Sequence, residues 1–185
     1  MFWAYNVINT KDWGVPQNRL RVYIMGFRKD CLREHFNWPQ APVSSCQLDS
    51  FLDPLVGTVD LTVLPQGKGC RRTCLGALLN LFEQGKSPLQ TPAVCSIRNR
   101  VATTMLNCSP CLTASDAKEK GHWLLHRARL MTDDEIFRLQ GLRPERWELP
   151  PGVTASWLRK CVGNAMPGNV IKPLIAAALQ AMGYE

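Results

Sequence analysis

Apolar and polar residues alternate along the first part of the chain, which is the spacing of β-strands. The pattern predicts a strand, a turn at residues 13–16 and a second strand at residues 19–27. Gln17, Arg19 and Arg21 stand at alternate positions around the start of the second strand, so we expect one face to carry all three donor side chains. Guanidinium groups suit flat, oxygen-bearing partners such as carboxylates, phosphates and base carbonyls. Solvated or ion-paired arginines on an edge strand are the alternative interpretation.

The middle of the chain is irregular, because prolines and glycines divide it into short pieces after residue 29. We expect a helical turn at residues 50–53 and a longer helix at residues 73–83. Strand-like clusters of Val, Ile, Thr and Cys occur within residues 91–115, and residues 121–125 predict a strand leading toward a helix. The sequence therefore predicts a mixed α and β fold, with no internal repeat.

The last third of the chain contains two helix signals. Thr132 and Glu135 have the spacing of a capping box, and Gly141 is the expected left-handed stop of that helix. Residues 163–169 form a turn-rich loop, and the apolar stripe of residues 170–182 predicts an amphipathic terminal helix. Each signal alone is typical of ordinary scaffold helices.

Composition places the chain among folded globular proteins. Of its 185 residues, 45% are hydrophobic and 20% are charged. The longest apolar runs fall short of the roughly 20 residues that span a bilayer, so we expect no membrane partner. The first residues lack a basic-then-apolar leader. We therefore expect an intracellular location: the nucleus in a eukaryote, the cytoplasm or nucleoid in a bacterium.

The net charge of +7 is unevenly distributed. Residues 1–128 hold 15 Lys and Arg against 9 Asp and Glu, whereas residues 129–185 hold 7 against 6. A positive surplus of this kind neutralises phosphates when the partner is a nucleic acid. Many proteins without such a partner are equally basic.

Eight cysteines raise the question of a metal site. Cys70 and Cys74, together with Cys108 and Cys111, could form the two halves of a tetrahedral zinc site. The first pair is spaced more loosely than a usual zinc knuckle, so we favour reduced, metal-free cysteines. His122 and His126 are four residues apart, but the sequence around them predicts a strand and ordinary packed or exposed histidines.

Four segments, in this order, resemble the closing motifs of the DNA cytosine-5 methyltransferases. Residues 17–21 resemble the Q-x-R-x-R strand of the family, residues 110–115 its P-x-L-T-A-S strand, residues 129–141 its R-x-L-T-x-x-E-x-x-R-L-Q-G element, and residues 163–167 its G-N-[AS]-x-P loop. After Gly141 the chain departs from the family pattern, because Leu-Arg-Pro replaces an aromatic residue and proline. The resemblance covers essentially the whole chain but only the C-terminal portion of the family domain.

The resemblance implies the edge of a Rossmann-like methyltransferase lobe plus an irregular target-recognition lobe. Residues 1–30 would be the C-terminal strands of the catalytic lobe, residues 31–141 the target-recognition region, and residues 142–185 a return segment whose helix packs on the catalytic lobe. The family's glycine-rich cofactor turn, its Glu-Asn-Val segment and its upstream Pro-Cys are not found in this sequence. We therefore expect an N-terminal catalytic portion, on the missing sequence or on a separate chain.

The same resemblance implies roles for individual residues. Arg21 would contact the flipped cytosine, Arg19 would orient the site, and Gln17 would help to hold the displaced strand or backbone. Glu135 and Arg138 would be scaffold residues. The S-adenosylmethionine pocket and the double-stranded DNA partner would be contacted, respectively, by Asn164, Ala165 and Met166 and by Arg71, Arg72, Arg98 and Arg100.

Three further interpretations of the chain stay open. Without a nucleophile and a main cofactor turn, the chain alone is expected to be inactive. It could be a split subunit that is active with a partner chain, or a non-catalytic DNA-binding remnant. An RNA-directed member of the family is a further alternative, although nothing in the middle region points to transfer RNA.

Overall fold

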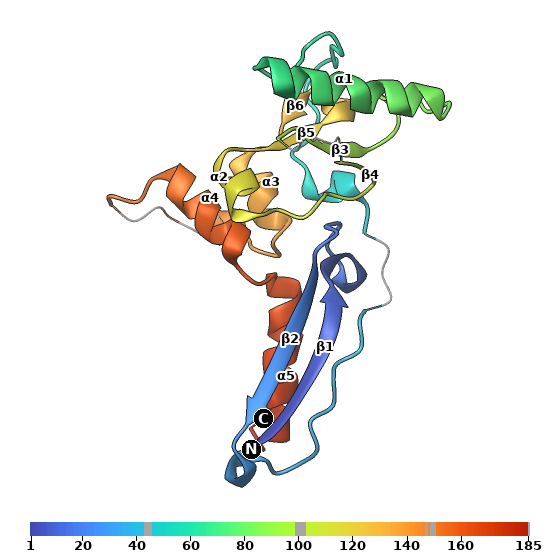
Figure 1. The fold of residues 1–185 in the computed structure, drawn as a ribbon. Helices are drawn as coiled ribbons and strands as arrows, with labels where there is room; N and C mark the ends of the chain where they lie inside the picture. The colour runs from blue at the N-terminus through green and yellow to red at the C-terminus, as the bar shows by residue number, and fades with distance from the viewer. Residues whose placement is uncertain (43–45, 99–102, 147, 149–150, 185) are drawn as a thin grey trace.

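The molecule has two lobes joined by a cluster of short helices. The computed structural model of the protein describes residues 1–42, 46–98, 103–146, 148 and 151–184. One lobe is a long hairpin of β1 (Phe2–Asn9) and β2 (Leu20–Phe27) with α5 (Gly168–Ala181) beside it (Figure 1). The other lobe is a four-stranded sheet covered by α1 (Lys68–Glu83), and both chain termini lie at the far end of the hairpin.

The hairpin is antiparallel and in register from Phe2 opposite Phe27 to Asn9 opposite Leu20. A 3₁₀ turn, Thr10–Trp13, follows β1 and ends at a left-handed Gly14 with φ of 81°. Alternate residues of each strand point to α5, and the core between them is listed by cluster: Ile8, Trp13, Tyr23, Val170 and Leu174 near the turn, and Phe27, Phe36, Ala178 and Ala181 near the termini. The predicted strands and terminal helix are therefore confirmed, and the segment around Phe36 packs with the hairpin although it lies beyond the expected boundary at residue 30.

The second lobe contains strands in the order β4-β3-β5-β6, all antiparallel. They are β3 (Ala93–Ser96), β4 (Thr103–Leu106), β5 (His122–Leu124) and β6 (Arg129–Leu130). The buried face of α1 packs on this sheet through Cys74, Ala77 and Leu81. This helix begins at Lys68 and not at the expected residue 73, because Gly67 ends the preceding loop and one glycine in the first turn does not stop a helix.

Three short helices lie between the lobes: α2 (Ala114–Lys118), α3 (Asp133–Arg138) and α4 (Ala155–Asn164). Leu112, Ile136 and Val162 are among the buried residues that join them in one core. Short 3₁₀ turns complete the structure at Lys29–Cys31, Leu48–Phe51, Leu125–Arg127 and Pro144–Arg146.

Two local expectations are wrong here. Residues 163–169 are not all loop, because Thr154 caps α4 and that helix continues through Asn164. Residues 110–115 are not a strand: Thr113 accepts a hydrogen bond from the Asp116 amide and starts α2 instead. In both places a capping side chain satisfies the free amides of a helix start, a signal that sequence inspection passed over.

None of the helices in the described parts of the chain is both long enough and apolar enough to cross a bilayer.

Candidate functional site

The site predicted around the arginines lies where the hairpin meets the short helices. Arg19 and Arg21 converge on one thiol: Arg19 Nη1 lies 3.5 Å and Arg21 Nη2 lies 3.3 Å from Cys111 Sγ. Arg21 belongs to β2, whereas Arg19 lies just before it, where its amide bonds back to the carbonyl of Gln17 at 3.0 Å. The bend at this point means that the three donors do not form one straight row.

Gln17 is turned away from the two arginines. It is fully buried, and its Nε2 donates to the Leu139 carbonyl at 2.6 Å. Its backbone pairs with Ser109 in an isolated bridge. The expectation that Gln17 faces DNA is therefore wrong for this conformation: the side chain instead fixes the end of α3 against the start of β2.

Arg19 ties three segments of the chain together. The side chain is 4% exposed, and its guanidinium donates to the carbonyls of Leu112 at 2.6 Å, Gly163 at 3.1 Å and Ala165 at 3.0 Å. Burial lowers the pKa of Arg19 from its ordinary value of 12.5, but an arginine stays charged at neutral pH. Its positive charge thus lies at the carboxyl end of α4, where the helix dipole favours a cation.

Arg21 is the exposed member of the pair. Its Nη1 donates to the Leu20 carbonyl at 2.7 Å, and Nη2 points to Cys111. A guanidinium has five N–H donors in a planar fork, so these two contacts leave donors for a planar acceptor from outside. The geometry can therefore present a fixed positive group beside a thiol at the surface.

The predicted cofactor residues lie next to Arg19. Ala165 reaches it through its carbonyl, while the side chains of Asn164 and Met166 are exposed, Met166 by 58%. The backbone here is tightly packed: a Cβ on Gly163 would lie 2.5 Å from the Thr113 carbonyl oxygen. The loop is thus held in place by Arg19 on one side and by α2 on the other.

Sequence reasoning did not identify Cys111 and Gly163 as parts of this site. The Pro-Cys dipeptide at 110–111 was visible, but Cys111 was considered only as half of a zinc pair. Gly163 stood within a recognised motif, yet its close contact with α2 depends on tertiary structure. Both residues contact partners far away in the sequence, which a local pattern does not reveal.

The predicted DNA-contact residues are spread over the other lobe. Arg71 and Arg72 are exposed on α1, the helix farthest from the hairpin in Figure 1. Arg98 follows β3 and forms an ion pair with Glu119. Arg100 lies outside the described residues. The structure therefore does not gather these residues around Arg21.

The expected capping box on α3 is confirmed. Thr132 accepts from the Glu135 amide at 3.2 Å, and Glu135 accepts from the Thr132 amide at 2.8 Å. Glu135 is fully buried and also accepts from Arg129, at 2.6 and 2.9 Å, and from the Asp53 amide at 2.9 Å. Burial alone would raise the pKa of Glu135, but these donors outweigh it and lower that pKa. Arg138 donates to Asp53 at 2.8 Å, so the whole cluster connects α3 to residues 51–53.

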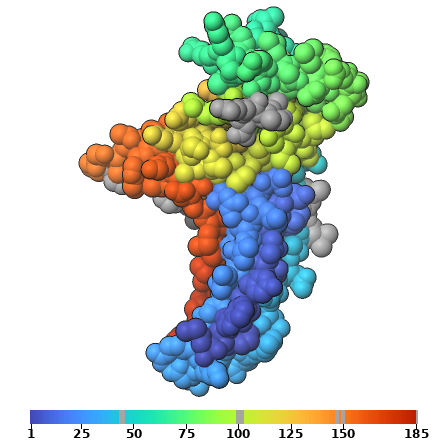
Figure 2. Space-filling model, in the orientation of Figure 1, coloured from blue at the N-terminus to red at the C-terminus, as the bar shows by residue number. Residues whose placement is uncertain are grey.

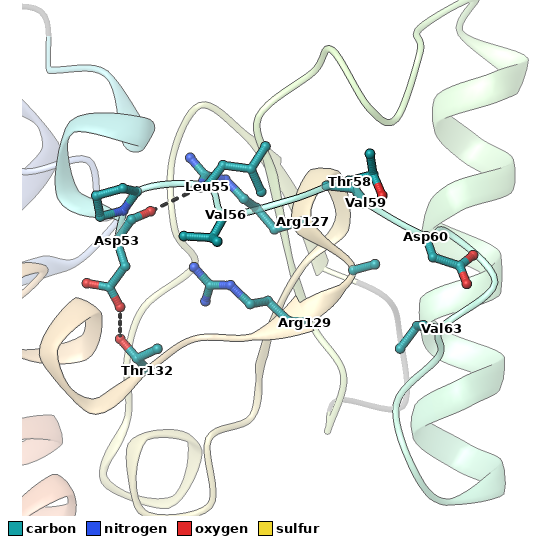
Figure 3. Close-up of a pocket in the computed structure, with 12 residues that line it drawn as sticks. Asp53, Leu55, Val56, Thr58, Val59, Asp60, Val63, Arg127, Arg129 and Thr132 are labelled. Carbon is teal, nitrogen blue, oxygen red and sulfur yellow. Dashed lines mark hydrogen bonds between the residues drawn. The ribbon is translucent and has the colours of Figure 1, made fainter.

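A cavity of about 400 Å³ lies beside this cluster, between residues 53–63 and the segment that contains Arg127 and Arg129 (Figure 3). Its cations are already paired. Arg127 donates to the Asp53 carbonyl at 3.0 Å and to Asp49 at 2.9 Å, and Arg129 is held by Glu135. The cavity therefore offers little uncompensated positive charge to an anionic ligand.

The cysteine pairs are not assembled into a metal site. Cys74 is buried under α1, where burial raises the pKa of its thiol to about 12, whereas Cys111 lies beside the arginines. Across residues 1–42, 46–98, 103–146, 148 and 151–184, no three His, Cys, Asp or Glu side chains group as potential metal ligands.

Comparison with known proteins gives the class of this fold and site. The family described as C-5 cytosine-specific DNA methylase matches residues 2–62 and 80–180, so the chain belongs to this family of methyltransferases. Type II methyltransferase M.Bsp6I from Bacillus sp. (strain RFL6) is 29% identical over 191 residues, covering 96% of this chain and 55% of that protein. Type II methyltransferase M.HaeII from Haemophilus aegyptius is 23% identical over 180 residues, covering 96% of this chain and 51% of that protein. The chain thus spans about half the length of these two curated relatives.

Solved structures agree on the fold. An Entamoeba histolytica methyltransferase, EhMeth, superposes with a TM-score of 0.52 at 15% identity, over 97% of this chain and 53% of that one. S. pombe Dnmt2 methyltransferase superposes with a TM-score of 0.51 at 13% identity, over 99% of this chain and 58% of that one. The mixed α/β architecture is accordingly that of part of a Rossmann-like methyltransferase, as expected.

Proposed function

We propose that this chain supplies the base-contacting and target-recognition part of a DNA cytosine-5 methyltransferase. It acts with a catalytic segment that carries the nucleophile, in the same polypeptide or in a separate subunit. The observation that carries the proposal is the exposed Arg21 guanidinium, fixed beside Cys111 and the buried Arg19. Because the substrate is DNA, we propose an intracellular location.

The chemistry requires a fixed cation near the target base. Cytosine C5 becomes nucleophilic when a thiolate adds at C6, and negative charge then develops on O2 and N3. A positioned guanidinium stabilises that charge as donors do in an oxyanion hole. Arg21 is the group we assign to O2, since it is exposed and keeps unused donors, and Arg19 is a positioning residue. The base must leave the duplex to reach this point.

Residues 164–166 fit one wall of an S-adenosylmethionine pocket. Asn164 offers an exposed amide, Met166 offers an exposed apolar side chain, and the loop between them is fixed through the Ala165 carbonyl. When bound, S-adenosylmethionine supplies the methyl electrophile. The role proposed for this loop is to hold the ligand and to exclude water beside Arg19.

Arg71 and Arg72 are proposed to contact phosphates. They are exposed on one turn of α1, and neutralised phosphates make binding salt-dependent. Replacing either residue by alanine should weaken duplex binding for every sequence and reduce the salt slope by roughly one unit or less. Equal salt slopes for the variants and the unchanged chain would remove α1 from the interface.

The test is methyl transfer by a hybrid protein, in which this chain replaces the part of M.Bsp6I that it matches. With tritiated S-adenosylmethionine and double-stranded DNA, the hybrid should incorporate label, whereas the chain alone should not. Arg21→Ala should reduce incorporation roughly 100-fold or more, in line with loss of an oxyanion-hole donor. Arg28→Ala, an exposed arginine paired with Asp30 away from the thiol, is the matched control. Label incorporation by the isolated chain, or full activity of the Arg21→Ala hybrid, would refute the proposal.

A DNA-binding module without catalysis is the second candidate. It is favoured by the position of Arg71 and Arg72 on a helix apart from Arg21. In that case duplex binding survives Arg21→Ala, depends on the α1 arginines, and no hybrid transfers methyl groups.

A further inference from the structure

The outer face of the β1–β2 hairpin is apolar along its whole length and uncovered. Its side chains are Trp3, Tyr5, Val7, Leu20, Val22 and Ile24, with exposed fractions between 49% and 71%. Strand register places Tyr5 opposite Ile24 and Val7 opposite Val22, so these side chains form one continuous surface. In Figure 2 the hairpin, in blue, lies open along the lower lobe.

This surface is larger and more regular than scattered exposed apolar residues. The opposite face of the same strands is packed on α5, so the hairpin is the middle layer of a structure with one side unfilled. Two-stranded ribbons are marginal in water, and both outer edges of the described hairpin are without a neighbouring strand. Contiguous exposed patches of this kind usually mark an interface.

We infer that the outer face of the hairpin is the surface on which the rest of the methyltransferase domain packs, as part of the function proposed above. The chain covers 96% of itself but only 55% of M.Bsp6I, so that relative has nearly as much polypeptide again. The expected occupant is that remaining segment, presenting apolar side chains of its own. The six side chains that form the surface include no cation, which makes nucleic acid an unsuitable occupant.

Continuity with the candidate site supports this occupant. Leu20 and Val22 flank Arg21 in the strand and point to the opposite face. A segment packed on Leu20 and Val22 therefore lies one strand thickness away from the guanidinium. The partner that covers this face is thus well placed to bring the nucleophile and the cofactor turn near Arg21.

The experiment compares the isolated chain with the M.Bsp6I hybrid by amide hydrogen exchange and urea unfolding. Amides of β1 and β2 should exchange roughly 10-fold or more slowly in the hybrid than in the isolated chain, because covered strands open less often. Ile24→Lys, at a position 71% exposed in the isolated chain, should leave the unfolding midpoint of that chain unchanged. In the hybrid it should restore fast exchange of the hairpin amides, by roughly 10- to 100-fold, the factor for removing one buried Ile side chain. Leu79→Lys, at a position 60% exposed on α1, is the matched control and should be neutral in both proteins.

Several results would overturn the inference. One is unchanged hairpin exchange in the hybrid; another is an Ile24→Lys effect equal to that of Leu79→Lys. A dimer of the isolated chain that Ile24→Lys dissociates would assign the face to a second copy, and binding to phosphatidylcholine vesicles lost in the same variant would assign it to lipid. A hybrid with a protected hairpin that transfers no methyl group would reject the proposed function and keep the interface. An active hybrid with an unprotected hairpin would do the reverse.

Discussion

Replacing Arg19 should destabilise the chain far more than replacing Arg21, although the two arginines contact the same thiol. Arg19→Ala removes a buried guanidinium and leaves the carbonyls of Leu112, Gly163 and Ala165 without that donor. Arg21 is exposed, and its backbone bond is to its neighbour Leu20. The comparison thus separates a positioning arginine from one that is available to substrate.

The magnitude follows from the number of bonds and their burial. A hydrogen bond that involves a charged group contributes about 1.5–3 kcal/mol net, and such values do not add fully within one cluster. Removing one partner from a buried ionic cluster costs about 3–5 kcal/mol. We therefore expect Arg19→Ala to lower the free energy of unfolding by about 3–5 kcal/mol, and Arg21→Ala by less than about 0.5 kcal/mol, as for an ordinary surface residue.

Arg19→Lys provides a graded control. Lysine keeps the positive charge at the end of α4 but is a compact point charge without the planar fork, so it cannot reach three carbonyls on separate segments. We expect about half of the alanine effect.

Urea unfolding followed by tryptophan fluorescence measures these differences, since the chain contains six tryptophans. The slope of the transition should be unchanged, which shows that the midpoint reports stability alone. Equal midpoints for Arg19→Ala and Arg21→Ala, or an Arg19→Ala effect below about 1 kcal/mol, would refute the role of Arg19 as the connection between the lobes.

Three further predictions concern packing, ion pairing and pH. Gly163→Ala should cost about 1–3 kcal/mol in unfolding free energy because the new methyl group meets a backbone carbonyl at 2.5 Å, whereas Gly76→Ala in α1, with open space around it, should stabilise by up to about 1 kcal/mol; thermal melting of both variants decides this. Glu135→Gln should cost about 2–4 kcal/mol because it removes the charge that holds Arg129, and an unchanged urea midpoint would count against the buried pair. Burial lowers the pKa of His122 from 6.5 to about 4, so its neutral form stabilises the fold above pH 6.5 and up to about 3 kcal/mol is lost as the pH falls to 4. Buried carboxylates act in the same direction at lower pH, so the check is whether His122→Gln flattens the curve between pH 6.5 and 5.

Much of the fold could be predicted because local chemistry determines it. The hairpin follows from alternation, the start of α3 from the capping box, and the stop of α3 from Gly141, which has a φ of 67°. The terminal helix follows from its apolar stripe. Each of these signals lies within a few residues of the element that it determines.

The parts that could not be predicted depend on contacts between distant segments. Gln17 bonds to Leu139, which is 122 positions away, and Arg19 bonds to Gly163, which is 144 positions away. Such bonds decide the bend between Gln17 and β2, and no alternation rule contains them. Helix α4 was missed for a different reason: its cap at Thr154 follows a proline- and glycine-containing stretch, and turn signals there obscured the helix start.

The two faces of β2 link assembly to catalysis. Successive side chains of a strand point to opposite faces, so the alternation that directs Arg21 toward Cys111 also directs Leu20 and Val22 to the uncovered surface. A shift of one residue in the register with β1 would exchange the two sets and place a guanidinium in the interface. Covering the outer face therefore favours the single register in which Arg21 reaches the thiol side. On this reasoning, a partner that binds the hairpin stabilises the orientation of Arg21 without contacting it, and substitutions on the outer face should weaken methyl transfer together with assembly.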